Sequence, residues 1–192
     1  ETAFLASLPR NLKDGSPFHG AVFTDKGLAM AKPRPEDRYY LCHVCIWSGS
    51  LYRLAAVRQV GLPNQDYVLD WGEFEYGNRM MKAGYKGFVD QQSILHHNIR
   101  GAPSLNPIDI KLGLATATVY EFPPIRCYYM SRNMLYFMLY DVARGRLGLA
   151  RRVVWTVFKL TANFVLRPRN HGGEIAACFR GIWDGITGNI AA

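Results

Sequence analysis

Cysteine is scarce in this chain, and its scarcity excludes a fold built on disulfides. Four cysteines among 192 residues cannot cross-link a domain of this size. Cys42 and Cys45 have the CxxC spacing of a zinc or redox site, but no second such pair accompanies them. They lie in the apolar, strand-like run YYLCHVCIW, where cysteine often serves as a small hydrophobic residue. We therefore predict a structural role for both thiols, with metal or redox chemistry as the alternative.

Acidic residues are absent from one long stretch, and this absence produces most of the net charge. Between Val142 and Gly173 there are seven arginines and lysines and no aspartate or glutamate, in a chain whose formal net charge is +8. A basic segment can serve nucleic acid, an anionic membrane or a phosphorylated substrate. Because these charges lie among Val, Phe and Trp residues, we expect an anionic membrane surface as partner and no nucleic acid.

No apolar run in this basic segment is long enough to span a bilayer. The run from Val153 to Leu166 is interrupted by Lys159 and falls short of the roughly 20 residues that a span requires. Arg152, Thr156 and Lys159 follow helical spacing and form a polar stripe. We predict an amphipathic helix lying in the membrane interface. The alternative is a helix packed against its own domain, with its arginines solvated.

The sequence also lacks internal repeats, low-complexity tracts and a recognisable signal peptide. Its hydrophobic content of 49% is ample for a packed core. Because the chain begins with Glu1 rather than methionine, we expect a fragment or a processed product. Prolines predict a loop-rich region over residues 1–38. Mixed strands and helices then predict an α/β part over 1–124 and a helical tail over 125–192.

Three carboxylates gather where the stretch LDWGEFEYGNRMMKAGY predicts the start of a helix. Asp70 followed three residues later by Glu73 fits a capping box. Glu75 lies four residues before Arg79, so we expect it to be solvated or paired with that arginine. Gly72 argues against a purely stabilising role for the group, because glycine in a helix costs roughly 1 kcal/mol relative to alanine. Asp70 is thus predicted to be a cap, while Glu73 stays open between capping and chemistry.

Two adjacent histidines, His96 and His97, end the apolar strand predicted in KGFVDQQSILHH. Adjacent strand residues point to opposite faces, so only one of them can share a site with Glu73. A carboxylate with an imidazole suits Mn²⁺ or Mg²⁺ together with phosphate oxygens. A purely structural role for the histidines is the alternative.

Four motifs in order, SGSLYRLAAVRQVGLP, DWGEFEYGNRMMKAGYKG, SILHHN and YYMSRN, give the chain a family resemblance. Over residues 40–140 the sequence resembles the C-terminal half of family 2 inverting glycosyltransferases. It looks closest to the rhamnosyltransferase and galactofuranosyltransferase branch, which builds bacterial surface polysaccharide. The resemblance implies an α/β fold, namely the C-terminal half of a GT-A (Rossmann-like) glycosyltransferase followed by a helical, partly amphipathic tail.

The resemblance also implies roles for individual residues. Trp71-Gly72-Glu73 matches the family's tryptophan-acid-acid motif, with Gly72 in place of the first acid, and makes Glu73 the catalytic base. Such a base takes the proton from an acceptor hydroxyl as that oxygen attacks the anomeric carbon of the donor. His96, with His97 as the alternative, matches the histidine that helps hold the divalent metal, Mn²⁺ or Mg²⁺. The residues implied on the acceptor side are Trp47, Ser48, Gly49, Ser50, Trp71 and Arg132.

One part of the family pattern is missing. The nucleotide-binding half has an Asp-x-Asp metal motif, and no Asp-x-Asp occurs in these 192 residues. We therefore expect a part that is incomplete for turnover by itself.

The function implied is that of a metal-dependent inverting glycosyltransferase. It would move sugar from a nucleotide-diphosphate donor to a saccharide or lipid-linked saccharide, as a peripheral protein on the cytoplasmic face of the cell membrane. The alternative is a non-catalytic, membrane-peripheral interaction module with a degenerate glycosyltransferase fold.

Overall fold

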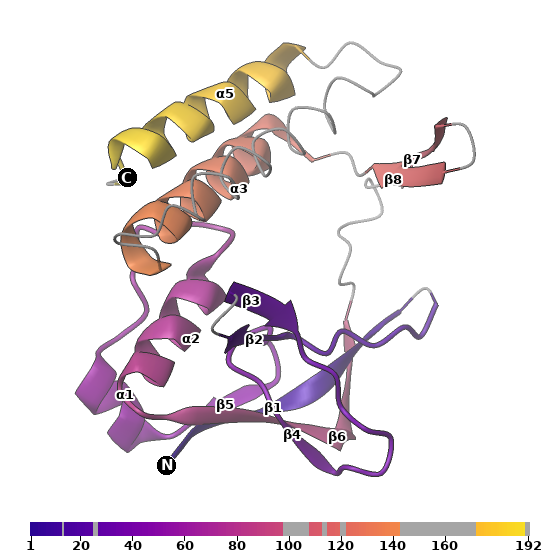
Figure 1. Cartoon of the computed structure of the whole chain (residues 1–192), viewed down its shortest axis with the longest axis vertical. Helices are drawn as coiled ribbons and strands as arrows, with labels where there is room; N and C mark the ends of the chain where they lie inside the picture. Colours follow the sequence, from indigo (N-terminus) through magenta and orange to yellow (C-terminus); the bar gives the residue numbers. More distant parts are fainter. Residues whose placement is uncertain are drawn as a thin grey trace. The chain divides into compact units, whose positions relative to one another are not determined.

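The computed structural model is a mixed α/β structure with a sheet that contains parallel strands, which confirms the predicted α/β class (Figure 1). The residues that it describes are 1–12, 14–24, 27–97, 108–112, 115–119, 122–142 and 172–190. The chain forms two compact units, which are described separately below. The first comprises residues 1–64 and 73–101, and the second comprises 65–72 and 102–192. The sequence predicted a boundary at 124, whereas both 65–72 and 102–124 belong with the second unit.

The first unit is built on a four-stranded sheet with the order β4-β6-β1-β5. Its strands are β1 (Thr2–Asn11), β4 (Tyr39–Leu41), β5 (Ser50–Tyr52) and β6 (Lys86–His97). The central pair, β1 and β6, is parallel, and the outer strands are antiparallel to their neighbours. A hairpin and two helices complete the unit: β2 (Ala21–Thr24), β3 (Gly27–Met30), α1 (Leu54–Val60) and α2 (Gly72–Lys82).

Strand β1 shows that the loop-rich prediction for residues 1–38 was wrong. Its ten residues include the buried Pro9, although proline is normally excluded from central strands. Strand β5 pairs with β1 only from Phe4 to Ala6. Beyond Ala6 this side of β1 is free of β5, so the missing N–H of Pro9 removes no bond to that strand. Beyond β5 this side of β1 is covered instead by residues 16–18, where the Phe18 N–H donates to the Pro9 carbonyl at 2.9 Å.

One face of the sheet carries the core and is called here the helix face. Phe4, Ala6 and Leu8 alternate along β1, are buried and belong to the same cluster as Met80 of α2. Tyr52 links them, because its ring lies 5.3 Å from that of Phe4 and 5.6 Å from that of Tyr76 on α2. Helix α2 is thus packed on the face that displays the even-numbered residues of β1.

The second unit is dominated by two helices that lie side by side (Figure 1). Its elements are a hairpin of β7 (Ile108–Leu112) and β8 (Ala115–Val119), helix α3 (Pro124–Tyr136), the π-helix η1 (Phe137–Val142) and helix α5 (Gly172–Thr187). The hairpin was not anticipated from sequence. The amphipathic helix predicted over 153–166 lies outside the described residues. None of the helices described is both long and apolar enough to cross a membrane.

Close approach of α3 and α5 depends on glycine. A Cβ atom on Gly181 would lie 2.3 Å from the carbonyl oxygen of Tyr128, and one on Gly185 would lie 2.5 Å from that of Arg132. Both distances are far inside van der Waals contact, and the obstructing atoms are backbone. The two helices can therefore adopt this spacing only with glycine at these positions.

We expect Gly181→Ala to lower the free energy of unfolding by about 1–3 kcal/mol, because the added methyl must push two packed backbones apart. Gly173→Ala on the same helix is the matched control, since its Cβ would meet only the Pro124 ring at 3.8 Å. Urea unfolding of the two variants measures the difference. Equal stabilities would contradict the glycine-dependent packing of α3 on α5.

Candidate functional site

Two of the three carboxylates at the start of α2 are engaged in ion pairs. Glu75 is buried and accepts from Arg79, with 3.0 Å between Oε2 and Nη2, which confirms the predicted i,i+4 pairing. Asp70 is not the predicted cap. Helix α2 begins two residues later, at Gly72, and the Asp70 carboxylate accepts from Nε and Nη2 of Arg126 at 3.1 and 3.2 Å. Asp70 and Glu75 therefore each have an arginine partner in the structure.

Glu73 is half-buried in the first turn of α2. Its negative charge contributes to the raised pKa values of Cys45 and of Tyr52 on β5. Burial raises the pKa of the Cys45 thiol to about 12, and the negative charge of Glu73 adds to that rise. Burial is also the main cause that raises the pKa of Tyr52, and Glu73 again contributes. Glu73 thus acts electrostatically on Cys45 and Tyr52, which belong to or pack against the core of the first unit.

The small-residue turn predicted on the acceptor side adjoins these two residues. Its backbone closes through a bond of 3.1 Å from the Ser50 N–H to the Trp47 carbonyl, and Gly49 adopts a positive φ of 73°. The Ser50 hydroxyl donates to the Ile46 carbonyl and lies 3.4 Å from Sγ of Cys45. Trp47, Ser48 and Gly49 are exposed. The structure thus brings the predicted turn and Glu73 to the same neighbourhood of the first unit.

The two histidines at the end of β6 point to opposite faces. Register pairs His96 with Arg10 and His97 with Asn11 on the parallel strand β1. Arg10 continues the alternation of Phe4, Ala6 and Leu8, so exposed His96 belongs to the helix face, where Glu73 also lies. His97 belongs to the other face, and its Nδ1 is buried without a hydrogen-bond partner.

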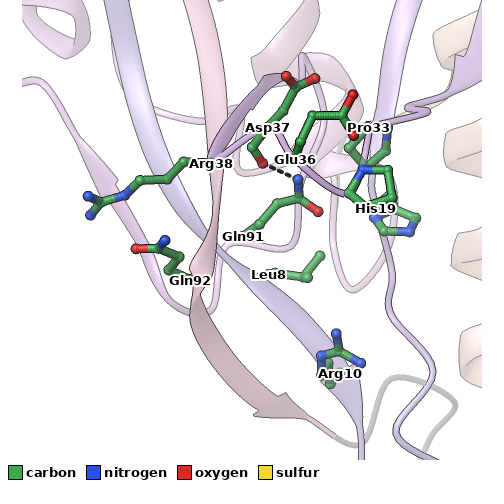
Figure 2. Close-up of a pocket in the computed structure, with 10 residues that line it drawn as sticks. Leu8, Arg10, His19, Pro33, Glu36, Asp37, Arg38, Gln91 and Gln92 are labelled. Carbon is green, nitrogen blue, oxygen red and sulfur yellow. Dashed lines mark hydrogen bonds between the residues drawn. The ribbon is translucent and has the colours of Figure 1, made fainter.

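A cavity of about 470 Å³ opens on the helix face at the same end of β1. Figure 2 shows side chains from β1, β6 and two loops around it. The loop that carries Glu36 and Asp37 is fastened by Gln91, whose amide donates to the carbonyls of Arg34 and Asp37. The lining comprises Leu8, Arg10, His19, Pro33, Pro35, Glu36, Asp37, Arg38, Gln91 and Gln92. Sequence reasoning missed this cavity because its loops carry no periodic pattern.

The chemistry of this cavity suits a neutral polar ligand. Its two arginines and two carboxylates cancel in formal charge. Burial, followed by the nearby charge of Arg10, lowers the pKa of His19, so the imidazole is neutral at physiological pH. Pro33 and Pro35 offer apolar surface, while Gln92 offers an exposed amide. Hydroxyl groups, which both donate and accept hydrogen bonds, match such a lining better than a strong anion or cation would.

Within the second unit, the segment just before α2 has an unusual backbone. Leu69 and Trp71 have φ values of 66° and 73°, in a region that residues other than glycine rarely adopt. Strain of this kind costs on the order of 1–3 kcal/mol per residue and persists only where surrounding structure imposes it. Here Asn133 imposes it, because its Nδ2 donates to the carbonyls of Val68 at 2.9 Å and Asp70 at 2.7 Å.

Arg132, predicted to bind acceptor, is buried within α3 and supports the same segment. Its Nε donates to Oδ1 of Asn133 at 2.9 Å, and its Nη2 donates to the carbonyl of Asp66. The guanidinium also lies 4.7 Å from the ring centre of Tyr129. The arginine and asparagine of the YYMSRN motif therefore hold the backbone that leads into the Trp71-Gly72-Glu73 motif.

The CxxC pair has the surroundings of a structural element. Cys42 and Cys45 are buried in the core of the first unit, and burial raises the pKa of Cys42 to about 11. The Cys42 thiol donates to the carbonyl of Val44 at 3.0 Å. In the part of the chain that the structure describes, no three His, Cys, Asp or Glu residues are grouped as metal ligands. Both thiols are protonated at neutral pH, as suits small core residues.

No family model matches this chain, and neither do the curated proteins or the solved structures with which it was compared. Its function must therefore be argued from its own residues.

We expect Asn133→Ala to lower the free energy of unfolding by about 1–3 kcal/mol, because it removes two hydrogen bonds that hold the backbone of a strained turn. The control is Arg126→Ala, which breaks a half-exposed ion pair to the same segment and should cost only about 0–1 kcal/mol. Denaturant titration of both variants measures this. A larger loss for Arg126→Ala would show that Asn133 does not hold the segment.

Proposed function

We propose that this chain contributes the catalytic base and acceptor side of an inverting glycosyltransferase with a GT-A-like fold. The observation that carries the proposal is the convergence of Glu73 with the turn at 47–50 on the helix face. These residues come from two sequence motifs that were matched to the family independently, and the fold brings them together in one unit. His96, from a third motif, belongs to the same face.

The register along β1 gives the distance between the proposed acceptor side and His96. Ser50, beside Cys45, pairs with Ala6, and His96 pairs with Arg10 four residues later, which corresponds to roughly 13 Å along the strand. A separation of that order suits two parts of one substrate assembly better than one shared ion. Glu73 would serve the acceptor hydroxyl, while Arg10 and His96 would serve the phosphates of the donor.

In the proposed reaction, the Glu73 carboxylate accepts the proton of the acceptor hydroxyl as that oxygen attacks the anomeric carbon. The bond from the anomeric carbon to the diphosphate oxygen breaks on the opposite side, so the configuration inverts without a covalent enzyme intermediate. Asn133 and Arg132 act as positioning residues, because they fix the backbone that precedes Glu73. The neutral, hydroxyl-matching cavity beside Arg10 offers a place for a sugar ring.

A divalent cation, Mn²⁺ or Mg²⁺, belongs to this proposal. His96 is the described residue that would hold it, at the carboxyl end of a parallel strand pair where ligands of α/β proteins commonly bind, and no three possible protein ligands are grouped in the described part of the chain. Arg10 on the adjacent strand would pair with phosphate rather than with metal. When bound, the ion would offset negative charge on the departing diphosphate.

Membrane attachment on the cytoplasmic side, with a lipid-linked saccharide as acceptor, is the further part of the proposal. The basic segment between Val142 and Gly173 is its support in the sequence. A non-catalytic interaction module with the same fold is the competing function, and the next experiment separates the two.

Glu73→Gln should reduce sugar transfer by about 10²–10⁴-fold, because the amide cannot take the proton of the acceptor. The assay uses the native protein purified from the organism that produces it. Labelled dTDP-rhamnose or UDP-galactofuranose is the donor, and a lipid extract of the same organism supplies the acceptor. Donor binding and thermal unfolding should not change. Glu174→Gln, at a first-turn glutamate of α5, is the matched control. Undiminished transfer by Glu73→Gln would remove the proposed base, and no transfer by the wild-type protein would favour the interaction module.

His96→Ala should weaken Mn²⁺ binding about tenfold in the presence of UDP, because it removes an imidazole ligand. Electron paramagnetic resonance of free Mn²⁺ measures this without any turnover. His97→Ala is the paired variant, since that imidazole belongs to the opposite face of the sheet. A loss confined to His97→Ala would transfer the role to His97, and two unchanged titrations would exclude both.

A further inference from the structure

Helix α5 exposes a continuous apolar face in the second unit. Phe179, Trp183 and Ile186 are 52%, 68% and 45% exposed, although large apolar side chains normally seek burial. With the exposed Ala176, they recur at helical spacing and form one stripe, called here the α5 stripe. Such a row along one helix marks an interaction surface rather than scattered surface residues.

The opposite face of α5 is fully used by the packing on α3. Cys178 and Ile182 are buried in the core of the second unit, and Gly181 and Gly185 lie against the α3 backbone. The helix therefore cannot turn the α5 stripe inward without losing these contacts. The stripe stays directed away from α3.

The exposed charge on α5 is basic, while its two acidic residues are half-buried. Both acidic residues of α5, Glu174 and Asp184, are half-buried, and Asp184 accepts from the Tyr128 hydroxyl at 2.7 Å. The exposed charge on the helix is Arg180. In the sequence, α5 directly follows the stretch with seven basic residues and no acid. An exposed apolar stripe on a helix that directly follows a basic stretch of sequence suits anionic lipid, because the stripe can enter the acyl boundary while arginine and lysine attract the headgroups.

We propose that the α5 stripe inserts into the interface of an anionic bilayer, with Trp183 at its centre. Tryptophan is enriched at this depth because its ring is apolar while its N–H can reach headgroup oxygens. This location for membrane contact does not depend on the helix predicted over 153–166. It also does not require catalysis, although it would bring the proposed transferase to a lipid-linked acceptor.

Flotation of the full chain with vesicles rich in phosphatidylglycerol tests the proposal. The double variant Phe179→Ser/Trp183→Ser should lower the partition coefficient at least about tenfold, because it removes two large apolar side chains from the interface. Leu51→Ser/Leu62→Ser, at two exposed leucines of the first unit, is the matched control and should float as wild type does. Glu73→Gln should also float unchanged, which separates this result from the fate of the proposed catalysis. Wild-type-like flotation of the stripe variant would overturn the proposal.

A second measurement does not depend on the double variant's folding. All four native cysteines are buried, so a thiol-reactive dye should label the exposed cysteine of Ile186→Cys in preference to them. The emission of this environment-sensitive dye then reports on the α5 stripe. Its emission should shift to the blue on phosphatidylglycerol vesicles, while the same dye at Leu62→Cys should not respond. An unshifted dye would overturn the proposal. Vesicle-independent dimers in gel filtration that are lost in the stripe variant would assign the stripe to a second copy of the chain instead.

Discussion

The hydrogen bonds of the Asn133 amide are the constraint on which the candidate base depends. A single buried side chain donates to two backbone carbonyls, those of Val68 and Asp70, and so fixes a segment in which Leu69 and Trp71 have positive φ. Its carbonyl oxygen is itself taken by Arg132, so the amide cannot turn away. Because Gly72 follows this segment directly, the strained turn leads into the first residue of helix α2.

The three carboxylates that open α2 have been separated by their partners. Glu75 is bound to Arg79 and Asp70 to Arg126, so each has an ion-pair role that requires no substrate. Glu73 instead lies near Cys45 and Tyr52, beside a turn of small, exposed residues. A half-buried carboxylate in this setting has access to a substrate while its neighbours are neutral. The proposed base at Glu73 therefore rests on this position and on its match to the tryptophan-acid-acid motif of the family that the sequence resembles.

In the proposed membrane enzyme, one surface would serve catalysis and another would bind the membrane. In the first unit, the helix face of the sheet carries the His96 imidazole and a charge-balanced cavity. In the second unit, the glycine-based packing of α5 on α3 commits one side of α5 to the core and leaves its apolar stripe for lipid. In each unit the packed elements fix the orientation of the side chains that are proposed to act.

The sequence by itself determined the local elements whose signals are contained in neighbouring residues. The α/β class, the pairing of Glu75 with Arg79 and the structural cysteines follow from composition or spacing rules and are found in the structure. Only the tertiary structure decided what depends on distant partners. Strand β1 forms despite its proline because β6, more than seventy residues away, pairs with it, and Asp70 leaves its predicted capping role because Arg126 competes for the carboxylate. The cavity and the exposure of the α5 stripe likewise depend on how separate segments pack. The cavity is lined by residues that are far apart in the sequence, and the sequence of a helix alone does not say which of its faces another element covers.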